Sequence, residues 1–354
     1  MKMFKTGELA VIETQKIVPV NMRFRNLAKI AILLSCIHFL FSGNSSFAQQ
    51  NPQKIGVILS IGGLGDHAFN DAAYEGVKNL RVSGNFKIDV FEPSDLPAIE
   101  RLMDFFGTCD YDLIVGIGVF ASDPIKKIAK KFPKKNFLLL DAAVEAPNIL
   151  SILFNEEEGS FYAGALASLL SKSGKIGFLG GFHSPAIEVF ERGFRNGAKF
   201  LNPSVDVTVQ YAGNTPEAFN APETGEKLGR EMASAGVEVI YHAAGRTGLG
   251  LIEAAKKTDI QVIGVDADQS SLAPGKVAAS MMKKLDKALE TGAKLLKEGK
   301  FKGGVLTLGL ADGGIKLELS QFHKQVFTPL ILERLKQVED FLTRKASLPV
   351  DPKK

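Results

Sequence analysis

The sequence predicts an α/β protein built from two doubly wound, parallel-sheet lobes. Short apolar runs alternate with amphipathic segments, and this alternation occurs twice in tandem, at about 54–150 and 174–268. Continuous apolar strands joined by helices are typical of parallel sheets that are covered on both faces. In this architecture ligands bind beyond the carboxyl ends of the strands.

The first series begins with KIGVILS and contains the fully apolar run YDLIVGIG, both of which are typical of buried strands. The segments between such runs have helical periodicity. The expected strands are 54–60, 86–92, 111–118, 136–143 and 148–154, and the expected helices are 69–83, 95–107 and 122–132.

The second series opens with a helix whose first turn holds three glutamates, which suits the helix dipole. Strands and helices then alternate as before. The expected helices are 155–174, 185–202, 223–235 and 250–258, and the expected strands are 174–181, 205–213, 237–245 and 260–268.

The remaining residues predict one long helix over 276–299 and a final helix over about 327–345. Between them, residues 304–319 predict two short strands around a turn.

The first 48 residues have the three parts of a secretory signal peptide. Arg23, Arg25 and Lys29 form a positive start, residues 30–41 form a short apolar core, and Ser46-Phe47-Ala48 offers small residues before a cleavage site. The apolar core is too short for a comfortable membrane span. Met22 is a candidate for the true start, and a buried helix is the alternative.

Cys36 leaves two fates open for this leader. Leu33-Leu34-Ser35-Cys36 is similar to a lipoprotein cleavage box, after which Cys36 would carry lipid and anchor the protein to a membrane. The apolar run continues past Cys36 to Phe41, however, so cleavage after Ala48 fits better.

Charge argues against nucleic-acid binding. The net charge of +4 belongs to the leader, because residues 1–48 contain six basic and two acidic residues. A mature chain that is close to neutral has no basic surface for a phosphate backbone.

Catalytic and cofactor motifs are weak. Gly63-x-Gly65-x-x-Ala68 formally fits a dinucleotide fingerprint, but Asp66 would stand where a pyrophosphate needs positive potential. The sequence has no P-loop, no G-x-S-x-G and no H-E-x-x-H. The two cysteines do not have the spacing of metal ligands. We therefore expect that the protein is not an enzyme and that it binds no cofactor and no metal.

The residues at strand ends suit a ligand with a planar part and a hydroxylated part. Phe69 could pack the helix onto the sheet or form a flat wall for a flat ligand, with Asn70 offering a donor and an acceptor. Asp141 and Asp266 each close an apolar strand, and each could cap a turn or accept hydrogen bonds from sugar hydroxyls. Lys283 follows early in the predicted long helix, and it could equally be a solvated lysine.

Several stretches in this order make the chain resemble the basic membrane protein (BMP) family, the purine-nucleoside receptor (PnrA-like) lipoproteins of bacterial ABC transporters. The resemblance covers about 54–318. It rests on GLGDHAFNDAAYEG, FNEEEGSFYAGALASLLSKSGKIGFLGG, PAIEVFERGFRNGAKFLNP, VIYHAAGRTGLGLIEAA, VIGVDADQ and LAPGKVAASMMKKLDKAL.

The resemblance implies a type I periplasmic-binding-protein fold, with hinge crossings between the lobes and a ligand cleft between them. We expect 53–155 and about 272–305 in one lobe, and 156–271 and about 306–345 in the other. It also implies that the exported protein, periplasmic or membrane-anchored, passes a nucleoside to permease and ATPase subunits.

Carried onto this sequence, the family's site implies a role for each of nine residues. Phe69 would stack on the base, Asn70 would bond its edge, and Asp141 would meet the base edge or the sugar. Asp266 would hold ribose hydroxyls, with Lys283 nearby. The remaining expected contacts are Tyr241 as a second ring face, Phe182 as an apolar wall, Gly245 in the loop after the strand, and Ser60.

Three positions depart from the family's usual pattern. Ser60 stands where an aspartate is common, Arg246 follows Gly245 where the family usually has a second glycine, and His67 replaces a lysine. These departures bear on which ligand is preferred. Another small polar solute, such as a sugar or a signalling molecule, is the alternative from the same fold, and a secreted enzyme is the alternative from another class.

Overall fold

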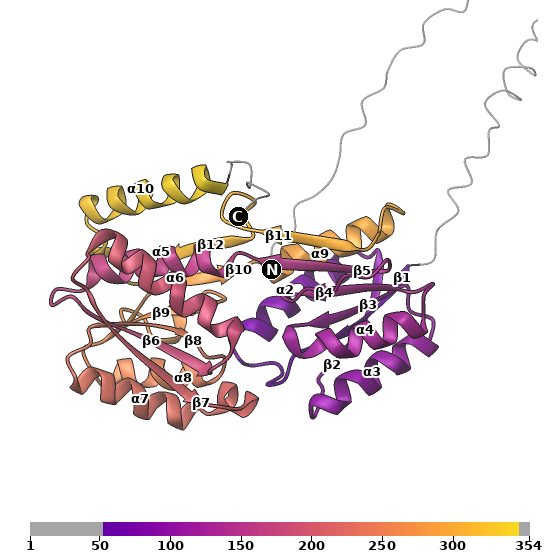
Figure 1. Cartoon of the computed structure of the whole chain (residues 1–354), viewed down its shortest axis with the longest axis horizontal. Helices are drawn as coiled ribbons and strands as arrows, with labels where there is room; N and C mark the ends of the chain where they lie inside the picture. The colour runs from indigo at the N-terminus through magenta and orange to yellow at the C-terminus, as the bar shows by residue number, and fades with distance from the viewer. Residues whose placement is uncertain (1–51, 347–354) are drawn as a thin grey trace, which may run out of the picture. The chain divides into compact units, whose positions relative to one another are not determined.

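The computed structural model describes residues 52–346 and contains two six-stranded sheets with helices on both faces (Figure 1). The first sheet has the order β11-β5-β4-β3-β1-β2, and the second has the order β12-β10-β9-β8-β6-β7. The first is made of β1 (Gln53–Ile58), β2 (Phe86–Phe91), β3 (Leu113–Ile117), β4 (Asn136–Leu140), β5 (Ile149–Phe154) and β11 (Gly304–Leu308). The second is made of β6 (Lys175–Phe182), β7 (Asp206–Gly213), β8 (Val239–Ala243), β9 (Gln261–Asp266), β10 (Val277–Lys283) and β12 (Ile315–Leu319).

Both sheets confirm the predicted α/β class, and the two strand orders correspond position by position. All neighbouring strands pair in parallel except β10 and β12, which are antiparallel. We call each sheet with its helices a lobe. Because β4 and β9 hold equivalent places in their sheets, the residues that follow them are equivalent too.

Alternate residues of the strands enter two helix layers in each lobe. In the first lobe, Val57 faces α2 (Phe69–Val82) and α9 (Leu285–Lys297), whereas Ile58 faces α3 (Leu96–Thr108) and α4 (Ser122–Lys131). In the second lobe, Phe178 faces α5 (Glu156–Leu170) and α6 (Pro185–Leu201), whereas Leu179 faces α7 (Pro222–Ser234) and α8 (Thr247–Lys256). Burial on both faces explains why these strands are apolar throughout.

The last helix, α10 (Pro329–Ala346), packs on α5 of the second lobe. Val338 and Leu342 meet Ala165 there.

The chain passes between the lobes three times: after β5, after β10, and between β11 and β12. Backbone hydrogen bonds join these crossings, from Asn155 N to Leu308 O at 2.9 Å and from Lys284 N to Gly314 O at 2.9 Å. The buried Glu158 carboxylate also accepts from Leu310 N at 2.9 Å. Three short, adjoining segments of this kind are suited to act as a hinge.

Two elements differ from the sequence expectation. Residues 276–299 form the strand β10 and then α9, not one helix, because the β10 side chains are buried between β9 and β12. Sheet membership therefore assigns β10 to the second lobe, although the sequence suggested the first lobe from about residue 272. Residues 304–319 do form two strands, but β11 and β12 belong to different sheets and make no hairpin.

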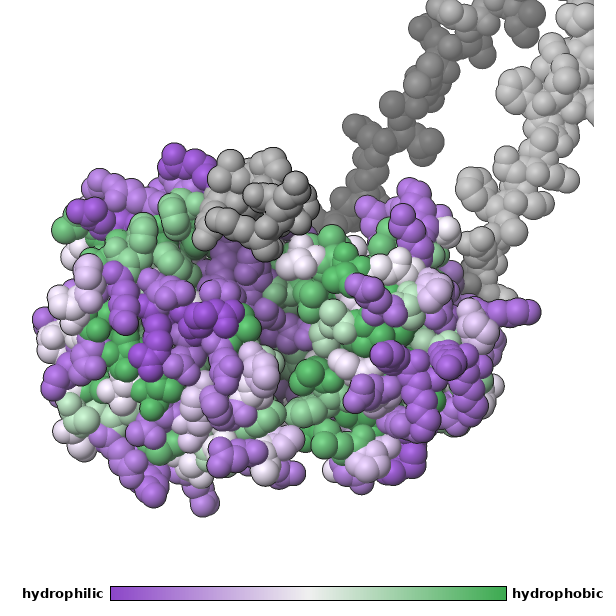
Figure 2. All heavy atoms as spheres, viewed as in Figure 1, coloured by the Kyte–Doolittle hydropathy of each residue, from purple (hydrophilic) through white to green (hydrophobic). Residues whose placement is uncertain are grey.

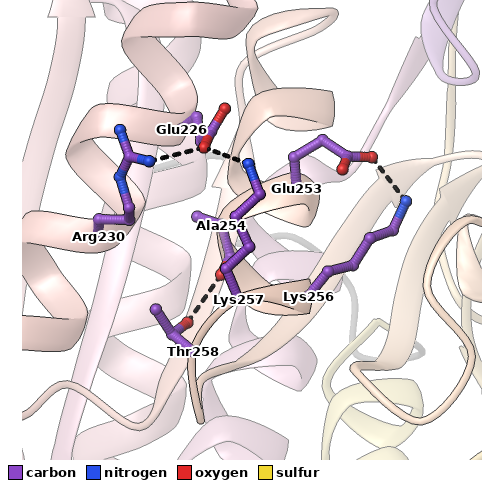
Figure 3. A network of polar contacts seen from close by, with 7 residues as sticks. All are labelled: Glu226, Arg230, Glu253, Ala254, Lys256, Lys257 and Thr258. Atoms are coloured by element: carbon purple, nitrogen blue, oxygen red, sulfur yellow. Dashed lines mark hydrogen bonds and ion pairs between the residues drawn. The ribbon is translucent and has the colours of Figure 1, made fainter.

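A surface network links α7 to the end of α8 (Figure 3). The Glu226 carboxylate accepts from Arg230 Nη1 and from Lys257 Nζ, both at 2.8 Å, and Thr258 Oγ1 donates to Ala254 O at 2.9 Å. Such exposed ion pairs contribute little stability each. The network therefore orients the two helices more than it stabilises the fold.

Apolar side chains on the face shown in Figure 2 are interspersed with hydrophilic ones. Among the described residues, no helix is both long and apolar enough to cross a membrane. The predicted signal peptide, Met22 and Cys36 lie outside the described residues, so cleavage and lipidation stay predictions.

Glycines allow α5 and α6 to touch through their backbones, which leads to a stability prediction. A Cβ on Gly197 would overlap the carbonyl oxygen of Phe161. Gly197→Ala should therefore lower the free energy of unfolding by about 2 kcal/mol, because the helices must move apart. Urea denaturation measures this loss.

The matched control is Asn196→Ala, at an exposed position of the same helix. Alanine favours helix there and meets no backbone, so this variant should be at least as stable as the parent. Equal stability of the Gly197 variant and the parent would contradict the close packing.

Candidate functional site between the lobes

The loop from β1 to α2 brings the expected site residues of the first lobe to the carboxyl edge of its sheet. Gly62, Gly63 and Gly65 have positive φ angles of 107°, 62° and 81°, a conformation that glycine adopts without strain. The loop therefore turns tightly after Ser60 and delivers Phe69 at the start of α2.

Asp66 organises this loop, although the sequence interpretation gave it no role. Its carboxylate accepts from the backbone N–H of Ala68 at 2.9 Å, Asn70 at 2.8 Å and Asp71 at 3.1 Å. These bonds cap the first turn of α2, and an aspartate just before a helix is the signal that could have revealed it.

Asn70 is buried within the same network. Its Oδ1 accepts from Ser60 N at 2.8 Å, and its Nδ2 donates to Asp66 at 3.1 Å. The amide keeps one free N–H and one free lone pair. The structure thus places Asn70 and Ser60 beside Phe69, and Asn70 first of all holds the loop together.

Phe69 points toward the second lobe. The Lys283 Nζ lies 4.7 Å from the centre of its ring, and the side chain is half-buried. Gly118 has a φ of 82°, and a Cβ there would lie only 3.1 Å from the Phe69 ring. The ring therefore lies close both to the backbone of the first lobe and to the lysine of the second.

Lys283, at the end of β10, is the centre of a buried charged cluster. Its Nζ lies 2.8 Å from Asp141 Oδ2, 3.5 Å from Asp266 Oδ1 and 3.8 Å from Glu156 Oε1. Its side chain is only 3% exposed. Asp141 comes from the first lobe and the other members come from the second, so the cluster joins the two lobes. A second ring, that of Phe190 on α6, lies 5.3 Å from the same Nζ.

Asp141 directly follows β4 and Asp266 is the last residue of β9, so both lie at the carboxyl ends of equivalent strands, and both have a φ of 65°. Non-glycine residues rarely adopt this left-handed conformation, which concentrates at functional sites. Oδ1 of each aspartate is buried and accepts no hydrogen bond from an N–H or hydroxyl of the described residues. Both atoms can therefore accept a further hydrogen bond, and Asp266 Oδ1 also lies 3.5 Å from the Lys283 ammonium.

Burial and mutual repulsion raise the pKa values of two acids of the cluster. Burial raises the pKa of Asp266 to about 6, although the Lys283 charge opposes the rise. Burial, together with the Asp141 charge, raises the pKa of Glu156 well above its ordinary value. For Lys283, burial lowers the pKa, but the attraction of Asp141, Asp266 and Glu156 outweighs it and raises the pKa overall. The lysine therefore stays charged.

Two further side chains of the second lobe bond the backbone of the β1–α2 loop. Arg246 Nη2 donates to Gly65 O at 3.3 Å, and Gln269 Nε2 donates to His67 O at 3.1 Å. Arg246, one of the departures from the family pattern, thus bridges the lobes instead of pointing to solvent. Gln269 is fully buried, and its Oε1 lies 2.9 Å from the His242 Nε2.

Aromatic rings meet across the lobes near these bonds. Phe182, at the end of β6, stacks on Phe120 of the first lobe with ring centres 6.4 Å apart. It also meets the edge of Phe219 at 5.5 Å. Gly245 has a φ of 55°, and a Cβ there would lie 3.1 Å from Phe219 O. Phe182 and Phe219 therefore form one aromatic wall, which Gly245 adjoins. The sequence interpretation did not include Phe219, which lies in a short 3-10 helix, Pro216–Asn220.

Tyr241 differs from the expectation of a second ring face. It is fully buried, its ring packs against Phe178 and Phe194, and its hydroxyl lies 3.2 Å from Ser160 Oγ. Its place in β8 directs it into the layer of α5 and α6. The half-buried Phe219 is better placed than Tyr241 to present a ring at the strand ends.

Two surface recesses lie apart from the charged cluster. One, of about 350 Å³, lies over α6 and includes His183, Glu188 and Arg195. The other, of about 340 Å³, lies between α2 and residues 267–272. The cluster itself is enclosed by the contacts between the lobes.

Among the described residues, no group of three or more histidines, cysteines or acids is arranged to hold a metal ion.

These features define a class of protein. Two α/β lobes, three hinge-like crossings and facing polar and aromatic groups at the strand ends are the architecture of a solute-binding protein. A family profile described as "ABC transporter substrate-binding protein PnrA-like" matches residues 53–347. The chain belongs to this family, which consists of solute-binding proteins, not enzymes.

Curated relatives agree with this membership. Basic membrane protein A2 of Borrelia garinii subsp. bavariensis is 33% identical over 297 residues, covering 81% of this chain and 86% of that protein. A Lactococcus lactis protein named "ABC transporter nucleoside-binding protein BmpA" is 30% identical over 323 residues, covering 85% of this chain and 91% of that protein.

Solved structures agree as well. An ABC transporter solute-binding protein from Aeropyrum pernix K1 matches with a TM-score of 0.76 and 25% identity, covering 86% of this chain and 94% of that one. Substrate-binding proteins of ABC transporters are exported proteins.

Lys283→Met should destabilise the protein by about 3 kcal/mol or more near pH 8, because buried carboxylates lose their counter-charge. The loss should shrink toward pH 5. Without the lysine the acids have raised pKa values in the folded state, so protonation removes the penalty as the pH falls. Urea denaturation at the two pH values measures both effects.

Lys284→Met is the matched control, since Lys284 forms a half-exposed ion pair with Asp286 at 3.0 Å. It should change stability by less than about 1 kcal/mol at either pH. A Lys283 variant with the same loss at both pH values would contradict the electrostatic account of the cluster.

Proposed function

We propose that the protein binds a nucleoside, with a purine base favoured, between its lobes and delivers it to an ABC transporter. The observation that carries the proposal is the buried cluster in which two strand-end carboxylates, from different lobes, each have an oxygen that accepts no hydrogen bond from an N–H or hydroxyl of the described residues, close to an aromatic ring. Carboxylates accept strong hydrogen bonds from hydroxyl groups, and an aromatic face stacks on a planar base. The printed name of the Lactococcus lactis relative supports the same ligand class.

Each group then has a role. Phe69 stacks on the base, and Phe219 with Phe182 forms the apolar wall on the side of the second lobe. Asp266 and Asp141 accept hydrogen bonds from the sugar hydroxyls, while Lys283 holds both carboxylates in place. Ser60, Asn70 and Gly245 shape the loops around the ligand.

Closure of the lobes supplies most of the affinity. A ligand that touches both lobes stabilises the closed arrangement, and exclusion of water strengthens each polar contact. The bonds from Arg246 and Gln269 to the β1–α2 loop form only when the lobes meet, so they add to closure without touching the ligand. Transfer to the permease and ATPase subunits, export by the leader and a lipid anchor at Cys36 belong to this proposal.

Asp266→Asn should lower the affinity for ribonucleosides by about 10- to 100-fold and leave the affinity for free bases nearly unchanged, because only the riboside offers hydroxyls to the carboxylate. Phe69→Ala should lower the affinities for ribosides and free bases by similar factors, because both stack on the ring. Titration calorimetry with a nucleoside and its free base measures both variants.

Asp268→Asn, at an exposed position two residues away, is the control and should bind like the parent. If the Asp266 variant lost affinity equally for the riboside and for the free base, this carboxylate would not contact the sugar. Failure of every nucleoside to bind the parent protein would contradict the proposed function itself.

A further inference from the structure

Glu156 is the member of the charged cluster to which the sequence and the family comparisons gave no role. It is the first residue of α5, directly after the crossing from β5, and its side chain is 19% exposed. Its Oε1 lies 3.8 Å from Lys283 Nζ, and Asp141 Oδ2 lies 2.8 Å from the same Nζ, so the Glu156 and Asp141 carboxyl groups meet at one ammonium. Because α5 belongs to the second lobe and Asp141 to the first, this meeting of acids crosses between the lobes.

The cluster has more acids than bases. Asp141, Asp266 and Glu156 surround one ammonium, and Lys283 is their only ion-pair partner among the described residues. The other titratable groups that act on the cluster are the Tyr241 hydroxyl on β8 and the Asp66 carboxylate in the β1–α2 loop, and neither is a cation. Three buried carboxylates cannot all be ionised beside one cation without a large desolvation cost, so the cluster retains a proton.

Geometry selects Glu156 as the proton's site. Lys283 donates to Asp141 at 2.8 Å but lies farther from Glu156, so Asp141 is the better-compensated anion. Two carboxylates beside one ammonium repel each other, and protonating one of them removes this repulsion and lets it donate to the other. The raised pKa of Glu156 agrees with this assignment.

We propose that Glu156 is a positioning residue that stays protonated when the lobes are closed and donates its proton to Asp141, so that ligand binding is coupled to proton uptake. This inference rests on the proposed function, in which the lobes close around a nucleoside. When the lobes separate, Glu156 loses Asp141, gains water and keeps Lys283 in its own lobe. Both changes favour the ionised form, and the retained Lys283 charge favours it too, so opening releases the proton to solvent and closure takes it up again.

The sign of the pH dependence follows from this cycle. The pKa of Glu156 is higher in the closed form than in the open form, so closure is favoured while Glu156 is protonated. The advantage is lost as the pH rises from the open-state value toward the raised, closed-state value. Over that interval affinity should fall by up to about tenfold per pH unit.

Calorimetric titration with a purine nucleoside, in two buffers of equal pH and different ionisation enthalpy, counts the protons exchanged. At a pH between the open-state and closed-state pKa values of Glu156, the parent should take up protons on binding, at most one per ligand from this residue. The Glu156→Gln variant should take up no proton at residue 156, and its affinity should depend less on pH. Glutamine can donate an N–H to Asp141 but does not titrate. Its affinity should stay within about tenfold of that of the parent.

Glu157→Gln is the matched control, because Glu157 follows in the same helical turn but pairs with Arg192 at 2.7 Å outside the cluster. It should take up as many protons as the parent. Nucleoside binding with a heat independent of the buffer, or equal proton uptake by the Glu156 variant, would overturn the inference and leave the proposed function standing. Absence of nucleoside binding by the parent would overturn both.

Discussion

The ammonium of Lys283, buried among carboxylates from both lobes, is the interaction on which the site depends. A buried cation requires anions, and here two come from strand ends, Asp141 and Asp266, and one from the start of α5, Glu156. Separating the lobes removes Asp141, the contact at 2.8 Å, and leaves the lysine with the acids of its own lobe. The charge balance of the cluster therefore changes with lobe position, which makes binding, closure and protonation parts of one equilibrium.

The duplicated topology explains why these groups meet. The two sheets share one strand order, and in each the fourth strand of its series ends in an aspartate with a φ of 65°. The left-handed turn costs about 1 kcal/mol in each case and directs the carboxylate out from the sheet edge. Around this charged centre, side chains of the second lobe hold the glycine-rich β1–α2 loop by its carbonyl oxygens. Part of the contact between the lobes thus uses backbone acceptors of the first lobe, in addition to the side chain of Asp141.

Much of this could be predicted from local sequence. Apolar runs predict the strands of both sheets correctly up to residue 266, and the acids that end FLLLD and QVIGVD are the two aspartates of the charged cluster. Residues 277–283 were misassigned because alanine, methionine and lysine favour helix, whereas burial between β9 and β12 makes them a strand. Tyr241 was expected to face the ligand, whereas it faces the helix layer of α5 and α6. Alternation of residues along a strand does not tell which of its two faces meets which helix layer. Glu156 and Phe219 were missed since their roles arise only when distant segments meet.

A crystal structure of the protein with a purine nucleoside tests the central claim most directly. The account predicts sugar hydroxyls within hydrogen-bonding distance of Oδ1 of Asp266 and Oδ1 of Asp141, with the base on the ring of Phe69. A nucleoside bound in the recess over α6, or in the one between α2 and residues 267–272, with the Lys283 cluster unchanged, would contradict it.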